Sequence, residues 1–136
     1  MDVRELTAES EREAAVPILR HLWRDESPED VLAWTGEDEY RLFGGFLGDD
    51  LIAVAGVLER RHLHHERRAW LYGLVVDEPH RGAGHGRSMV EFVEEWAEKQ
   101  GCVSISLASP LDKEGVHEFY RTLDYDEWGY VIEKGL

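Results

Sequence analysis

The stretch that decides the fold is PHRGAGHGR at residues 79–87, which has glycine at every second position from 82 to 86 and an arginine on each side. It follows the apolar run LYGLVV at 71–76 and precedes GRSMVEFVEEWAEKQ at 86–100, whose apolar residues have helical spacing. Because glycine has no side chain, its backbone N–H groups are accessible, and such groups close to the amino terminus of a helix form a site for an anion. Arg81 and Arg87 add positive charge, so the loop predicts a phosphate or pyrophosphate site between a strand and a helix.

The spacing of this loop differs from two common nucleotide motifs. A Walker loop has four residues between its outer glycines and then a lysine, whereas three residues separate Gly82 from Gly86 and Arg87 follows. The dinucleotide fingerprint Gly-x-Gly-x-x-Gly opens a parallel β-α-β fold, but here Gly-x-Gly-x-Gly comes late in the chain. A plain connecting turn is the remaining alternative, and two flanking arginines in an acidic chain argue against it.

Alternation and helical spacing predict one α/β (α+β) domain over residues 1–136, with the element order β-α-α-β-β-β-α-β-α-β. Ser27 followed by Pro28 and two acids is typical of a helix start. No repeat or linker divides the chain. The predicted elements are a strand at 3–7, helices at 9–23 and 28–36, strands at 40–47, 51–63 and 69–76, a helix at 86–100, a strand at 102–109, a helix at 113–123 and a strand at 127–134.

The charge of the chain excludes some partners. There are 29 Asp plus Glu residues against 15 Lys plus Arg, and the net charge is −14. Such a field repels nucleic acid and anionic membranes. The acids are spread along the chain and lysine is scarce, which is typical of solvated faces and of proteins that fold in concentrated salt. The charged amino-terminal segment lacks the order of a signal peptide and no apolar run reaches bilayer length, so we expect a soluble cytoplasmic protein.

Two segments resemble the GNAT superfamily of acetyl-CoA-dependent N-acyltransferases. RGAGHG at 81–86 fits the family hallmark of Arg or Gln, two residues, Gly, one residue, then Gly or Ala after a strand. EFYRTLDYDE at 118–127 is similar to the family's late Phe-Tyr helix and the turn after it, with Asp124 in place of the usual glycine. Aspartate tolerates the left-handed conformation better than most residues. The resemblance implies a GNAT-like fold, a mixed and mostly antiparallel sheet of about 6–7 strands flanked by about 4 helices.

The resemblance also implies where acetyl-CoA binds. The backbone of the strand would pair with the pantetheine arm, and the amides of the loop would hold the pyrophosphate. The residues expected to bind the cofactor are Leu74, Val75, Val76, Arg81, Gly82, Ala83, Gly84, His85, Gly86, Arg87 and Ser88.

Acetyl transfer to an amine requires a positioned amine, a donor to the oxyanion and a proton for the leaving thiolate. The resemblance implies Tyr120 as the general acid and the amide of Val76 as the oxyanion donor. Some family members have a glutamate where this chain has Trp70, so the general base stays open. The candidates are Glu66, which we take first, His64, Tyr72 and a chain of water molecules.

Other distinctive residues receive structural interpretations. The five tryptophans, at 23, 34, 70, 96 and 128, are expected in the core or a groove wall, with Trp34, Trp70 and Tyr72 lining the acceptor pocket. HLHH at 62–65 lacks a nearby cysteine, and we expect no metal. Cys102 is interpreted as a small apolar residue of a buried strand.

The sequence therefore predicts an N-acetyltransferase that transfers acetyl from acetyl-CoA to a primary amine by direct attack in a ternary complex. The acidic surface would attract a cationic amine, carried by a small molecule or a peptide. The alternative is a non-catalytic acyl-CoA-binding or regulatory module. The identity of the acceptor, the use of other acyl groups and the formation of a homodimer stay open.

Overall fold

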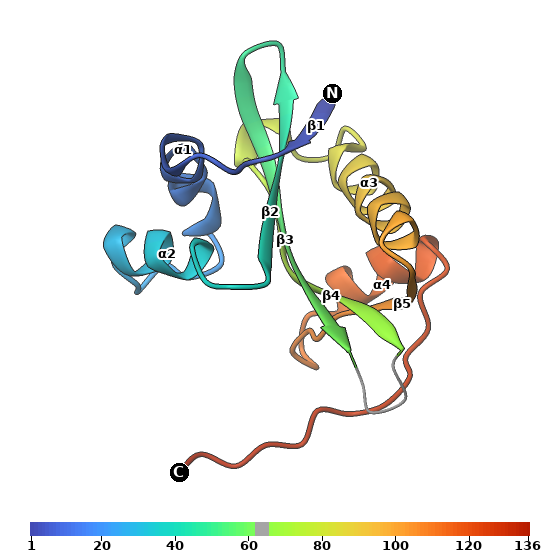
Figure 1. Ribbon diagram of the computed structural model, residues 1–136. Helices are drawn as coiled ribbons and strands as arrows, with labels where there is room; N and C mark the ends of the chain where they lie inside the picture. The colour runs from blue at the N-terminus through green and yellow to red at the C-terminus, as the bar shows by residue number, and fades with distance from the viewer. Residues whose placement is uncertain (62–65) are drawn as a thin grey trace. The chain divides into compact units, whose positions relative to one another are not determined.

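The computed structural model describes residues 1–61 and 66–136 and divides into two compact units, Met1–Ser106 and Leu107–Leu136. The elements of the first unit follow the predicted order (Figure 1). They are β1 (Asp2–Glu5), α1 (Glu9–Leu19), α2 (Pro28–Thr35), β2 (Tyr40–Leu47), β3 (Asp50–Arg61), β4 (Arg67–Val76), the 3-10 helix η1 (Glu78–His80), α3 (His85–Lys99) and β5 (Cys102–Ser106). The second unit contains α4 (Glu114–Thr122).

The described strands form one mixed sheet in the order β1-β2-β3-β4-β5. The first three pairings are antiparallel and the pairing of β4 with β5 is parallel. This confirms the α+β class and the mostly antiparallel sheet. The sheet of the described chain has five strands, fewer than the six or seven expected.

The missing element is the strand predicted at 127–134, which is a correction to the sequence analysis. These residues form no strand in the structure, and Trp128 and Ile132 are 98% and 92% exposed. Trp128 is therefore neither core nor groove wall. The segment has the composition of a strand, but a strand is stable only when its N–H and C=O groups pair with a neighbour, and the described chain provides no pairing here.

Each face of the sheet is covered within the first unit, by α1 and α2 on one side and α3 on the other (Figure 1). A cluster on the first face includes Leu19 and Val31 from the two helices and Val54 and Val75 from the strands. Burial of such side chains contributes about 1.5–3 kcal/mol each. On the α3 face, Phe43 contacts Phe92 and Trp96 edge to face, and the buried positions of α3 recur at helical spacing. The two faces of the sheet are therefore packed by different helices.

Helix α2 begins as the sequence predicts. The Ser27 hydroxyl accepts a hydrogen bond from the Asp30 amide at 3.1 Å, and Pro28 occupies the first helical position. A serine cap of this kind contributes about 1 kcal/mol.

In the second unit, α4 ends at a left-handed residue. Asp124 has φ 67°, the conformation for which the family uses glycine. Its amide donates to the Arg121 carbonyl at 3.1 Å, and the Tyr125 amide donates to the Tyr120 carbonyl at 3.0 Å. The turn expected after the late helix is thus formed with aspartate.

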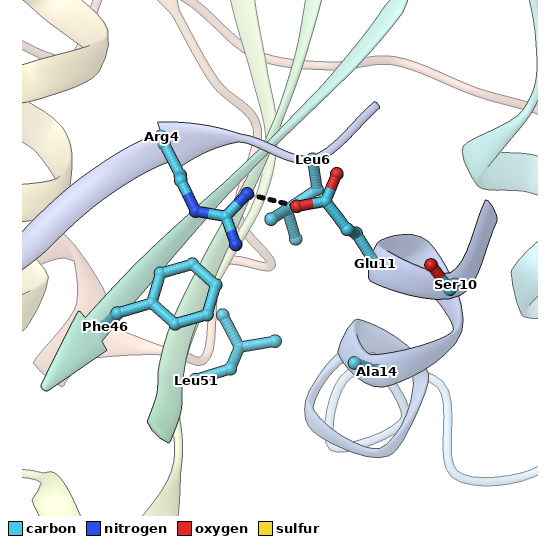
Figure 2. Close-up of a pocket in the computed structure, with 7 residues that line it drawn as sticks. All are labelled: Arg4, Leu6, Ser10, Glu11, Ala14, Phe46 and Leu51. Atoms are coloured by element: carbon cyan, nitrogen blue, oxygen red, sulfur yellow. Dashed lines mark hydrogen bonds and ion pairs between the residues drawn. The ribbon is translucent and has the colours of Figure 1, made fainter. Parts of the chain in front are cut away.

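A hollow of about 220 Å³ lies at the junction of β1, α1, β2 and β3 (Figure 2). The guanidinium of Arg4 lies 4.5 Å above the Phe46 ring and makes an ion pair with Glu11. The Arg4 guanidinium holds the pKa of the Glu11 carboxyl below its usual range. This hollow is lined by none of the loop residues predicted to bind the coenzyme.

Candidate active site

Strand β4 is paired on both sides for only part of its length. Its pairing with β3 continues to Val76, but its pairing with β5 ends at Trp70, opposite Ser106. From Leu71 to Val76, no described residue pairs with the β5 side of the strand. We call this the open edge of β4. Along this edge, β4 has backbone donors and acceptors without a strand partner, although β4 lies between β3 and β5 in the sheet.

A bulge in β4 lies where β5 departs. The partners Gly56↔Gly73 and Val57↔Leu71 leave Tyr72 as an extra residue on β4. A bulge bends the strand and increases its twist, so β4 turns away from β5 beyond this point. The only sequence signal for the bulge was Gly73, and this signal is ambiguous because a glycine can also lie in a regular strand and merely lower its stability.

The open edge has a defined set of free groups. The Asp77 amide donates to the Ile52 carbonyl of β3 at 2.7 Å. Because successive residues of an antiparallel strand alternate in the direction of their hydrogen bonds, the backbone groups of Leu74 and Val76 point away from β3, toward the open edge. The Val76 carbonyl already accepts a hydrogen bond from Arg81 Nε at 2.8 Å. The amides of Leu74 and Val76 are therefore available to a ligand lying along this edge.

The loop after β4 presents a second set of amides. Gly82 and Gly84 have φ of 80° and 85°, and Gly84 is the N-cap of α3. The amides of residues 82–87 donate to no acceptor in the described chain, and the first helical bond of α3 runs from the Ser88 amide to the Gly84 carbonyl. Six consecutive free amides thus lie at the positive end of a 15-residue helix, an arrangement of donors suited to an anion.

Three polar side chains of the loop and of the start of α3 already make hydrogen bonds or ion pairs to other protein atoms. Arg87 Nε lies 2.9 Å from Glu91, one turn along α3, and Arg81 is held by Val76. The Ser88 hydroxyl donates to the Gly84 carbonyl at 3.2 Å. The main donors to an anion here are consequently backbone amides.

The face of the sheet opposite α3 carries the predicted acceptor residues of β4. The register Tyr40↔Leu58↔Trp70 places these three side chains on that face. Tyr72, at the bulge, is 55% exposed. Trp34 belongs to α2, is 37% exposed and contacts Trp23 edge to face at 5.4 Å.

The first candidate base lies far from the open amides. Glu66 immediately precedes β4, is exposed and pairs with Arg68 at 3.2 Å. Ten residues of strand separate it from Val76, about 30 Å at the rise of a strand. The structure does not bring these two predicted residues together. His64, the second candidate, lies outside the described residues.

Tyr120 belongs to the second unit, on α4. Its ring contacts Phe119 at 5.0 Å and Tyr125 at 5.3 Å between centroids. Burial raises the pKa of Tyr120 to about 12. The phenol therefore stays protonated at every physiological pH, as a proton donor must.

Two groups near the open edge were missed by the sequence analysis. His21 Nε2 lies 3.4 Å from Asp77 Oδ1, directly after β4, and the Tyr40 hydroxyl lies against Gly56 beside the bulge. Both contacts join residues far apart in the sequence, so no local spacing could reveal them.

Within residues 1–61 and 66–136, no group of three or more His, Cys, Asp or Glu side chains could hold a metal ion. The HLHH segment is outside these ranges. Burial raises the pKa of the Cys102 thiol, which disfavours the reactive thiolate. In the same described ranges, no helix combines the length and apolarity needed to cross a bilayer.

Comparisons with known proteins show the family and the fold of this chain. The sequence pattern of the Acetyltransferase (GNAT) family matches residues 4–125. An uncharacterized N-acetyltransferase, YhdJ of Bacillus subtilis (strain 168), is 29% identical over 138 aligned positions, which cover 98% of this chain and 94% of YhdJ. Aminoglycoside N-acetyltransferase AAC(6')-Iy, solved in complex with CoA, superposes with a TM-score of 0.87 at 17% identity, covering 99% of this chain and 93% of that one. The structure of a transcriptional regulator from Bacillus halodurans C-125 superposes with a TM-score of 0.85 at 20% identity, covering 99% of both chains.

The open edge of β4 and the glycine loop before α3 are features expected of an acetyl-CoA-dependent N-acyltransferase. The chain belongs to the Acetyltransferase (GNAT) family, and it is an acetyl-CoA-dependent N-acetyltransferase.

Proposed function

We propose that this protein transfers the acetyl group of acetyl-CoA to a primary amine by direct attack in a ternary complex. One observation carries the proposal: the open edge of β4 is followed, after the single turn of η1, by six free amides at the start of α3. A ligand bound there would have an anionic group on the loop and a polar, extended arm along the strand. Acetyl-CoA has both, in that order.

In this proposal the pyrophosphate accepts hydrogen bonds from the amides of residues 82–87. The pantetheine arm then passes Val76 first and Leu74 second, because Val76 is nearer to the loop. We therefore assign the Val76 amide to the arm. The Leu74 amide, nearer to the bulge, is assigned to the thioester oxygen in place of the Val76 amide expected from the sequence.

The reaction then needs few groups. The lone pair of a neutral amine forms a bond to the thioester carbon, and the Leu74 amide stabilises the negative oxygen that develops. Collapse of this intermediate breaks the carbon–sulfur bond. The thiolate takes its proton from a general acid, for which Tyr120 is proposed, and the amine nitrogen loses its extra proton to a base. The products are an amide and coenzyme A.

For the base we propose water that reaches the bulge beside the exposed Tyr72. Glu66 lies about 25 Å along the strand from Leu74, by the rise of a strand. With water as the final proton acceptor, the fraction of amine that is unprotonated governs the rate. The rate should then rise with pH up to the pKa of the acceptor amine.

The acceptor is proposed to be cationic before it loses its proton. A net charge of −14 attracts such amines and repels anionic ones. One structural relative is an aminoglycoside N-acetyltransferase, which supports a small polyamine among the acceptors to be tested.

The test is an amine panel with acetyl-CoA, for example butylamine, tyramine, spermidine, kanamycin and a short peptide. We expect steady release of free thiol and a mass increase of one acetyl group on at least one amine. Binding of acetyl-CoA without turnover on any amine would contradict the proposal and favour a non-catalytic acyl-CoA-binding module.

A further inference from the structure

Two facing glycines form a notch on the acceptor face of the sheet, beside the bulge. Gly56 of β3 is paired with Gly73 of β4, and paired residues point to the same face. A Cβ on Gly56 would lie 2.0 Å from the Tyr40 hydroxyl oxygen, and one on Gly73 would lie 3.1 Å from Leu22 Cδ1. Because both residues lack a side chain, the Tyr40 phenol and the end of the Leu22 side chain lie close to the backbone in this notch.

The Tyr40 hydroxyl has no hydrogen-bond partner among the described residues. The ring packs against the apolar cluster under α1 and α2, yet its oxygen makes no hydrogen bond to any residue in the described chain. A packing role alone would be served by phenylalanine. Burial, together with the nearby Tyr72 phenol, raises the pKa of Tyr40, so the hydroxyl is neutral at physiological pH.

The place of this hydroxyl matches the thiol end of the arm. Gly73, across from Gly56, is adjacent to Leu74, whose amide faces the open edge. The side chain of Trp70, opposite Leu58, lies on the same face two register positions away. A neutral hydroxyl with a free lone pair thus lies on the face opposite α3, against Gly56 and across β3 from Gly73, the residue that precedes Leu74.

We propose that Tyr40 is a positioning residue for the acceptor, whose hydroxyl oxygen accepts a hydrogen bond from the amine N–H and directs the nitrogen lone pair toward the thioester. The inference rests on the proposed function. It also gives the class of acceptor, since the attacking nitrogen must keep an N–H for Tyr40 while its lone pair reacts. Primary amines satisfy this condition and tertiary amines do not.

The test compares Tyr40→Phe with the wild type, using the panel amine that the wild type acetylates fastest. Because one neutral hydrogen bond is lost, we expect KM for the amine to rise about 2- to 12-fold. KM for acetyl-CoA and the unfolding temperature should stay unchanged. Tyr130→Phe, an exposed tyrosine of the carboxy-terminal segment, is the matched control and should change neither KM.

Gly56→Ala is a second variant that acts on the same hydroxyl. Its new Cβ would displace the Tyr40 phenol from the notch and should also raise KM for the amine, with little effect on coenzyme binding.

The outcomes separate the possibilities. If KM for the amine is unchanged in both variants, Tyr40 does not have this role. If KM for the amine and KM for acetyl-CoA rise equally and the unfolding temperature falls, Tyr40 is a purely structural residue and the proposal is overturned. A wild type that binds acetyl-CoA but acetylates no amine overturns the proposed function first, and the inference with it.

Discussion

Replacement of Gly84 by alanine tests whether the loop holds the coenzyme through its amides. Gly84 has φ 85° and caps α3, and a Cβ built on it meets no protein atom within 4 Å. The methyl group would therefore clash with no protein atom, and it would occupy the space that a pyrophosphate approaches. The substitution also carries a backbone cost, since alanine in the left-handed region is strained by roughly 1–2 kcal/mol.

The loss of affinity can be worked out from the hydrogen bonds. One bond between an amide and a charged phosphate oxygen contributes about 1.5–3 kcal/mol. About 1.4 kcal/mol corresponds to a factor of ten in Kd. If the methyl group removes a single amide–phosphate bond, Kd for acetyl-CoA should rise at least about tenfold, as measured by isothermal titration calorimetry.

Gly101→Ala provides the matched control. Gly101 also has φ 85° with no atom within 4 Å of a built Cβ, but it follows the far end of α3. Both variants should lose the same few degrees of unfolding temperature because they carry the same strain, and only Gly84→Ala should lose affinity. Equal Kd values for the two folded variants would refute the amide cradle.

Three further outcomes are expected. Tyr120→Phe should lower kcat by about 10²- to 10⁴-fold with Kd for acetyl-CoA unchanged if the phenol is the acid; with a pKa of about 12, Tyr120 should add no basic limb to the rate below pH 10. Retention of a third of the wild-type kcat would exclude that role. Glu66→Gln should keep kcat within about twofold, since its distance from Leu74 is about 25 Å along the strand, and a large loss would restore it as the base. The unfolding temperature should rise from dilute buffer to molar potassium chloride if the −14 charge reflects salt adaptation, and a flat or falling curve would oppose that interpretation.

Local signals were sufficient for most of the fold. The Ser27 cap, the apolar run before the loop and the amphipathic pattern of α3 each depend on residues close together in sequence, and each element is present in the structure. The left-handed turn at Asp124 was predictable for the same reason, because it depends on one residue's tolerance of positive φ.

Features that depend on distant partners were not predictable. The segment at 127–134 has strand composition, but composition cannot tell whether a pairing edge is available. The bulge at Tyr72 depends on the register between β3 and β4, and the hydroxyl of Tyr40 can lie against the backbone of Gly56 only because Gly56 has no side chain. The sequence predicted the loop amides and, on the face opposite α3, Trp70 and Tyr72, but it gave no signal for Tyr40.

The extra residue in β4 links the stability of the sheet to its activity. Trp70 and Gly73 share a face although three positions separate them, because Tyr72 has no partner on β3. A chain without Tyr72 would keep every pairing of β4 with β3 in phase, and a straighter β4 could continue its ladder with β5. That protein would gain backbone hydrogen bonds and lose the space along the open edge. We therefore expect deletion of Tyr72 to change the unfolding temperature and the activity together, because the same extra residue lies in the register shift of the sheet and beside the open edge.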